Sequence, residues 1–151
     1  LKELELHSNK IQKLNENLFK NLKKLERLDL GANQLSALPP NIFANLVELK
    51  EIFLDSNQLA TLSHRHFRNN RKLESISLSG NKFNFISTAA FDNNENLRFV
   101  DTLGNVCIDR KYGNEGIEKD FTNVQEQFKC DVAESCPNHH VITGEIKNAG
   151  K

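Results

Sequence analysis

The chain has 151 residues, with 20 acidic and 20 basic side chains and therefore no formal net charge at pH 7. This length allows one domain with a modest core, and the neutral balance disfavours a nucleic-acid-binding protein, because no net field attracts phosphates. No stretch approaches the roughly 20 consecutive apolar residues that cross a bilayer, so we expect no membrane insertion within this sequence.

A pattern of twenty-four residues recurs along the chain, in repeats 1 to 4 and a half repeat that begin at Leu1, Leu25, Leu49, Leu73 and Leu97. Positions four and six of each repeat are apolar, except for Thr102, and they alternate with other residues as in a strand that buries one face. Because one repeat cannot cover its own apolar face, the repeats must stack and their strands become parallel neighbours. The sequence therefore predicts a solenoid over residues 1–106.

Two further columns indicate structural roles. Position nine is always Asn, at Asn9, Asn33, Asn57, Asn81 and Asn105. An amide inside a turn satisfies backbone groups that would each cost roughly 1–3 kcal/mol if left unpaired, so we interpret this column as structure. Position nineteen is always Phe, and each ring contributes roughly 1.5–3 kcal/mol when it fills the space behind the strands. These rings are Phe19, Phe43, Phe67 and Phe91.

These repeats resemble leucine-rich repeats of the kind common in animal extracellular proteins, with the pattern LxxLxLxxNxLxxLPxxxFxNLxx, over roughly residues 1–107. Repeat 2 carries the segment LSALPPNIFANL, with Pro after Leu38 as the family usually has. The resemblance implies an α/β solenoid with a parallel sheet on its concave face and an irregular or 3₁₀ convex side. His66, Asn70 and Asn94 stand where repeats 1 and 2 are apolar, so we expect a looser convex side in repeats 3 and 4.

The first repeat starts without the polar cap that such solenoids need at an end, so we expect a C-terminal fragment of a longer protein. At the other end, apolar residues at helical spacing predict an amphipathic helix that covers the last repeat as a C-terminal cap over residues 107–130. These residues are Ile117, Phe121, Val124 and Phe128.

The cysteines extend the resemblance. The ending N-x-C-I-D…C is similar to that of secreted insect leucine-rich repeat proteins, which implies a Cys107–Cys130 disulfide and an extracellular, oxidising location. Cys136 is then left over and indicates an intermolecular disulfide to a partner or a free thiol. Its pairing with Cys130, with Cys107 or with a cysteine beyond this sequence stays open. Residues 131–151 show no period and are interpreted as a tail or linker.

No pattern indicates catalysis or a cofactor. Cys130, Cys136, His139 and His140 do not have the spacing of a common structural zinc site. His64 and His66 fall on the convex segment, where solvated or partly packed histidines are ordinary. The sequence has no G-x-S-x-G or H-E-x-x-H motif and no phosphate-binding glycine loop. We therefore expect no enzyme, no metal and no cofactor.

Positions three, five and seven point away from the core onto the concave surface. They hold six acids against Arg27. Alternating charges at Glu3, Arg27 and Glu51 support one another, whereas Glu5 beside Asp29 costs stability. Phe53 is the leading anchor, because aromatic residues are enriched at protein interfaces, although single exposed apolar residues are normal. The candidate binding residues are Glu5, Asp29, Glu51, Phe53, Asp55, Ser77, Phe99 and Asp101.

These features predict a non-catalytic recognition module of a secreted or cell-surface protein, which binds a protein partner through its concave sheet in innate immunity or cell-surface signalling. Five strands offer a face of about 300 Å², whereas a standard interface needs roughly 800 Å² per partner, so we expect one part of a larger surface. The alternative is an intracellular scaffold or enzyme inhibitor with reduced thiols. Nucleic-acid binding through the basic convex residues is disfavoured.

Overall fold

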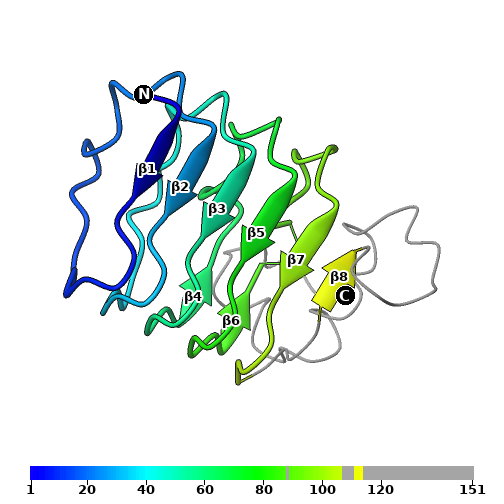
Figure 1. Cartoon of the computed structure of the whole chain (residues 1–151). Helices are drawn as coiled ribbons and strands as arrows, with labels where there is room; N and C mark the ends of the chain where they lie inside the picture. Colours follow the sequence, from blue (N-terminus) through cyan, green and yellow to red (C-terminus); the bar gives the residue numbers. More distant parts are fainter. Residues whose placement is uncertain (88, 107–110, 114–151) are drawn as a thin grey trace, which may run out of the picture.

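The computed structural model describes residues 1–87, 89–106 and 111–113, the last three by their backbone. Within them the chain coils through short strands that follow one another along the solenoid (Figure 1). Six of these strands form one sheet in the order β1-β2-β3-β5-β7-β8. Their bounds are β1 (Glu3–Glu5), β2 (Arg27–Asp29), β3 (Glu51–Phe53), β5 (Ser75–Ser77), β7 (Phe99–Asp101) and β8 (Lys111–Gly113).

The parallel sheet predicted from the alternating leucines is confirmed. The strands β1, β2, β3 and β5 each pair in parallel with the equivalent strand one repeat later, so that position four lies beside position four. The inward side chains of this column are fully buried from β2 onward, at Leu28, Ile52, Ile76 and Val100. Thr102, the exception at position six, is buried as well. Stacking thus gives each repeat the cover that it lacks alone.

Position eight, three residues after each strand of the parallel sheet ends, adopts a left-handed backbone in every repeat. The φ angles are 55° at Ser8, 50° at Ala32, 54° at Ser56, 62° at Gly80 and 72° at Gly104. This conformation strongly favours Gly, and small residues occupy the other three places. The turn brings Asn at position nine back under the strand.

The Asn side chains tie successive repeats together. Asn57 donates from Nδ2 to the carbonyl oxygens of Leu30, Leu54 and Asp55 at 3.0–3.1 Å, and its Oδ1 accepts from Leu35 N at 3.0 Å. Asn33 and Asn81 repeat this arrangement. Asn105 also links two repeats, whereas the exposed Asn9 bonds within its own turn.

The convex side returns through turns closed by hydrogen bonds to the residue three positions earlier, as at Leu22 N to Phe19 O (3.0 Å), which is the 3₁₀ pattern. Inside it the rings of position nineteen stack, with centroids 6.3, 5.5 and 5.7 Å apart from Phe19 to Phe91. A second, two-stranded parallel sheet forms where none was predicted, from β4 (Thr61–Leu62) and β6 (Phe85–Ile86).

The expectation of a looser convex side in repeats 3 and 4 is wrong. His66 is only 5% exposed, and Asn70 and Asn94 are fully buried. Asn70 Nδ2 donates to the carbonyl oxygens of Phe43 and Leu46 at 3.0 and 2.8 Å, and Asn94 bonds in the same way one repeat later. These amides exchange apolar packing for hydrogen bonds to the carbonyls of the preceding turn, so the side chains remain in the core.

At the C-terminal end, β8 pairs antiparallel with β7 and places Gly113 beside Phe99. This extension of the sheet was not predicted. The expected capping helix, Cys107, Cys130, Cys136 and the tail at 131–151 lie outside the described residues. The proposed boundaries between solenoid, cap and tail are therefore not addressed by the described part of the chain.

Candidate functional site

The candidate site is the outward face of the main sheet, which position three and position five of each repeat build. In β2, β3, β5 and β7 one buried side chain lies between two half-buried outward ones. In β1 both outward residues, Glu3 and Glu5, are exposed. Pairing on both sides holds the inner strands, so this face presents its side chains at a fixed spacing of about 4.8 Å between strands.

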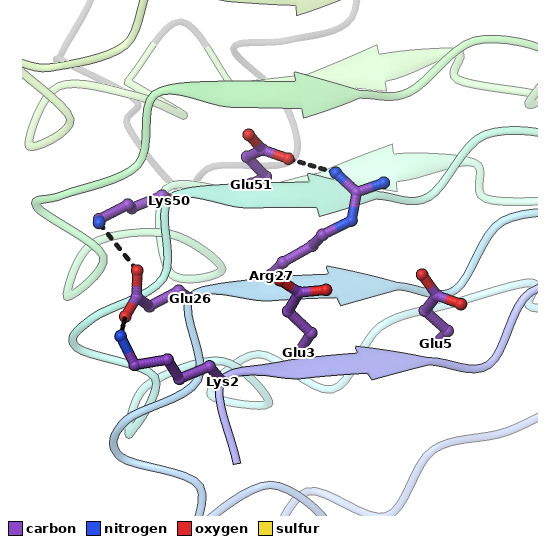
Figure 2. Close-up of a pocket in the computed structure, with 7 residues that line it drawn as sticks. All are labelled: Lys2, Glu3, Glu5, Glu26, Arg27, Lys50 and Glu51. Atoms are coloured by element: carbon purple, nitrogen blue, oxygen red, sulfur yellow. Dashed lines mark hydrogen bonds and ion pairs between the residues drawn. The ribbon is translucent and has the colours of Figure 1, made fainter.

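Phe53 lies at the centre of the described face and is half-buried. The guanidinium carbon of Arg27 sits 4.3 Å from its ring centroid, in a cation–π contact. The same guanidinium pairs with Glu51 (Figure 2). Phe53 is therefore no isolated exposed ring, because Arg27 covers one side of it. Arg27 stands at position three of repeat 2 and Phe53 at position five of repeat 3, which makes them diagonal neighbours on adjacent strands. This spacing is the sequence signal for the contact.

Acidic side chains gather beside this cluster. Glu5 lies next to Asp29 in the strand register. Asp29 Oδ1 accepts from Gly31 N at 2.9 Å. A Cβ atom at Gly31 would lie 3.1–3.3 Å from carboxylate oxygens of Asp29 and Asp55, so both carboxylates border this glycine. Within the part of the chain that the structure describes, Glu5, Asp29 and Asp55 form no ion pair.

Glu26, just before β2, belongs to an ion-pair ladder at position two, which was not predicted from the sequence. Glu26 lies between Lys2 and Lys50, with Oε–Nζ distances of 2.7 and 2.8 Å (Figure 2). The hydrogen bonds that these two lysines donate lower the pKa of Glu26 to about 2, and the bond that Lys50 donates to Glu26 raises the pKa of Lys50. Residues of opposite sign alternate along this column, which was the available signal: Lys2, Glu26, Lys50, Glu74 and Arg98.

A cavity of about 630 Å³ lies between this ladder and the concave face. Figure 2 shows the charged side chains that surround it. Among them, Glu26 and Glu51 already form ion pairs with lysine and arginine side chains. Most of its charge is thus used to join neighbouring repeats. We interpret the cavity as part of the stacking interface and not as a separate ligand site.

On β5 the outward side chains become neutral. Ser77 lies beside Phe53 on one strand and Asp101 on the other. The Ser77 and Ser79 hydroxyls are 3.5 Å apart. Phe99 is half-buried between Ser75 of β5 and Gly113 of β8. The candidate binding residues thus share one face, with most of the acids toward β1 to β3, small hydroxyls on β5, and Phe99 and Asp101 on β7.

Other classes of site find no support among the described residues. No group of three or more His, Cys, Asp or Glu side chains is arranged to hold a metal ion in the described ranges. Nor does the described part of the chain contain a helix of the length and apolarity that a membrane crossing needs.

A family model described as "Leucine rich repeat" matches residues 1–59 and 48–105. The chain belongs to the leucine-rich repeat family. Leucine-rich repeat proteins are solenoids whose concave surfaces are generally used for protein interaction and not for catalysis. The fold and the surface described above fit this family.

Two solved structures resemble this leucine-rich repeat chain. One is the leucine-rich repeat domain of APL1B, with 28% identity, a TM-score of 0.67 and 69% of the present chain covered. The other is the glycosylated form of the Toll–Spatzle complex, a molecular hub in Drosophila development and innate immunity, with 29% identity, a TM-score of 0.68 and 69% covered. The match spans 31% and 14% of those chains, so the present chain corresponds to a minor part of each. Comparison with curated proteins finds no match.

Proposed function

We propose that the chain is a non-catalytic recognition module that binds a protein partner through its concave sheet. The observation that carries this proposal is the set of uncompensated acids, Glu5, Asp29 and Asp55, next to the half-buried ring of Phe53. Like charges held together on a rigid sheet cost stability in the free protein. A cationic partner surface offsets that cost on binding. Partner binding therefore accounts for an arrangement of charges that does not stabilise the free protein.

The partner that fits is a protein with Lys or Arg beside an apolar side chain. The basic groups would pair with Glu5, Asp29 and Asp55, while the apolar side chain would rest against Phe53 and the small hydroxyls of β5. Phe99 and Asp101 would extend the contact toward β7, and Glu51 would hold Arg27 in place. Aromatic residues surrounded by polar contacts are the usual anchors of such interfaces.

The setting proposed is extracellular, in innate immunity or cell-surface signalling. Similarity to part of the Toll–Spatzle complex, described as a hub of innate immunity, supports this setting. The proposal includes a Cys107–Cys130 disulfide and a partner linked through Cys136. Intact mass before and after reduction tests whether one intramolecular disulfide forms, which a gain of two hydrogen atoms on reduction supports, and peptide mapping without reduction tests whether it joins Cys107 to Cys130. If freshly prepared protein has only free thiols, the extracellular assignment fails.

The binding proposal is tested with secreted proteins displayed as a panel against the intact chain. For any protein that binds, Asp29→Lys and Asp55→Lys should weaken binding at least about tenfold and reduce its dependence on salt, because complementary charge controls encounter. Glu95→Lys, an exposed acid on the convex side, is the matched control. A partner whose binding is lost with Glu95→Lys, and unchanged by both concave reversals, would place recognition on the other face.

A further inference from the structure

His66 occupies the place of a backbone hydrogen bond between two repeats. Between repeats 3 and 4, Ser87 N donates directly to Leu62 O at 2.8 Å. The equivalent groups one repeat earlier are Ser63 N and Leu38 O. There the imidazole intervenes: its Nδ1 accepts from Ser63 N at 3.1 Å, and its Nε2 lies 3.2 Å from Leu38 O. The ring thus bridges repeats 2 and 3 at the edge of β4.

The two partners fix the state of the ring. A carbonyl oxygen only accepts, so Nε2 must carry the hydrogen that bonds Leu38 O, whereas the Ser63 N–H requires a free lone pair on Nδ1. Both conditions are met by one neutral tautomer. The ring is 5% exposed and packs edge-on against Phe67, 6.5 Å away, which belongs to the stack of Phe rings.

No described residue that bonds to the ring or lines the cavity beside it carries a carboxylate that could compensate a positive charge. A cavity of about 390 Å³ borders it, lined by Leu38 and Pro40 of repeat 2, by Phe85 of repeat 4 and by four further residues of repeat 3. Its other ionisable groups, His64 and Arg65, are both bases. The carboxylates of the flanking turns, Glu16 and Asp92, do not line it. Burial lowers the pKa of His66, His64 adds to this effect, and the bond to Leu38 opposes it.

We propose that His66 is an acid-sensitive latch between repeats 2 and 3. A proton taken up from solvent at Nδ1 points an N–H at the N–H of Ser63, so the bridge breaks and the convex edge opens beside the cavity. The concave sheet contains no such histidine bridge in its described strands and stays paired. Acid would therefore loosen one edge of the solenoid and change its curvature without unfolding the binding face. This device is independent of the proposed function.

The direction of the pH effect follows from the preference of the fold for the neutral ring. The latch stabilises the fold fully above pH 6.5, the ordinary value for His, and this contribution is lost as the pH falls below it. Amide hydrogen exchange of the intact chain tests this, with rates corrected for intrinsic exchange. Protection of the Ser63 amide should fall about tenfold between pH 7.5 and 5, which corresponds to one hydrogen bond of ordinary net strength. The Ser87 amide, bonded directly to Leu62 O, should keep its protection.

Two variants isolate the ring. In His66→Gln the side chain can accept from Ser63 N and donate to Leu38 O but cannot titrate, so Ser63 should stay protected at both pH values. His64→Gln removes the exposed neighbour and should leave the wild-type response intact. If His66→Gln fails to fold, imidazole ¹⁵N shifts of the wild type decide: they must show the Nε2–H tautomer at pH 7.5 and titrate together with Ser63 protection. Constant Ser63 protection, equal loss at Ser63 and Ser87, or a persistent acid response in His66→Gln would overturn the proposal.

Discussion

Residues at the same position of the repeat contribute differently in different repeats. Asn57 and Asn9 share position nine, yet Asn57 is 6% exposed and joins two repeats, whereas Asn9 is exposed and bonds to Leu6 O and His7 O of its own turn. The amide chemistry is identical, so burial and the preceding repeat decide its contribution. Burial distinguishes Phe53 from Phe67 in the same way, because Phe53 is half-buried on the outward face and Phe67 is fully buried in the core.

Replacement of Asn57 by Ala tests the amide column. The substitution leaves the buried amide of Leu35 without its partner, whereas Leu30 O and Leu54 O each lose one bond and still accept from Asn33 and Asn81. We expect the free energy of unfolding to fall by about 1–3 kcal/mol, the cost of one buried group left unpaired. Denaturant unfolding measures this. Asn9→Ala should have much less effect, and equal losses would show that burial is not what matters.

Secondary-structure elements were predictable where one repeat carries the whole signal. The alternation at positions four and six located β1, β2, β3, β5 and β7, because strand periodicity is local. The strands β4 and β6 were missed, since two residues give no periodicity. The bridge at His66 could not be found from sequence, because it depends on how far Ser63 N lies from Leu38 O after stacking. Charge alternation at position two was visible only when repeats were compared as columns.

The ion-pair ladder at position two makes the stability of the fold depend on pH. The pKa of Glu26 falls from 4.5 to about 2 because Lys2 and Lys50 donate hydrogen bonds to it. Its contribution to stability is therefore present above pH 4.5 and is lost as the pH falls from 4.5 toward 2. Glu26→Gln should lower the melting temperature slightly at pH 7, since exposed pairs contribute little, and this difference should vanish near pH 2. Glu95→Gln, whose carboxyl forms no ion pair among the described residues, should show no such convergence.

Over the whole molecule, the stack separates stability from recognition. The rings of position nineteen lie between the sheet and the convex turns, where Phe43 and Phe67 each stack on the rings of the repeats before and after, while the acids and Phe53 lie on the opposite face of the sheet. Because every repeat depends on its neighbours, loss of one inner ring weakens the array, whereas loss of an outward ring affects a local surface. The proposed division of roles therefore predicts opposite outcomes for two Phe-to-Ala substitutions.

Phe53→Ala should weaken partner binding by about 2 kcal/mol or more, as truncation of an interface anchor does, and should lower stability by less than about 1 kcal/mol through loss of the Arg27 contact. Phe67→Ala should lower the free energy of unfolding by about 3–5 kcal/mol, because it leaves a cavity inside the stack, and should leave the affinity of the remaining folded protein unchanged. Calorimetric binding and denaturant unfolding of both variants distinguish these effects. If Phe53→Ala binds as tightly as the wild type, the ring is a support for Arg27 and the acids must hold the partner without it.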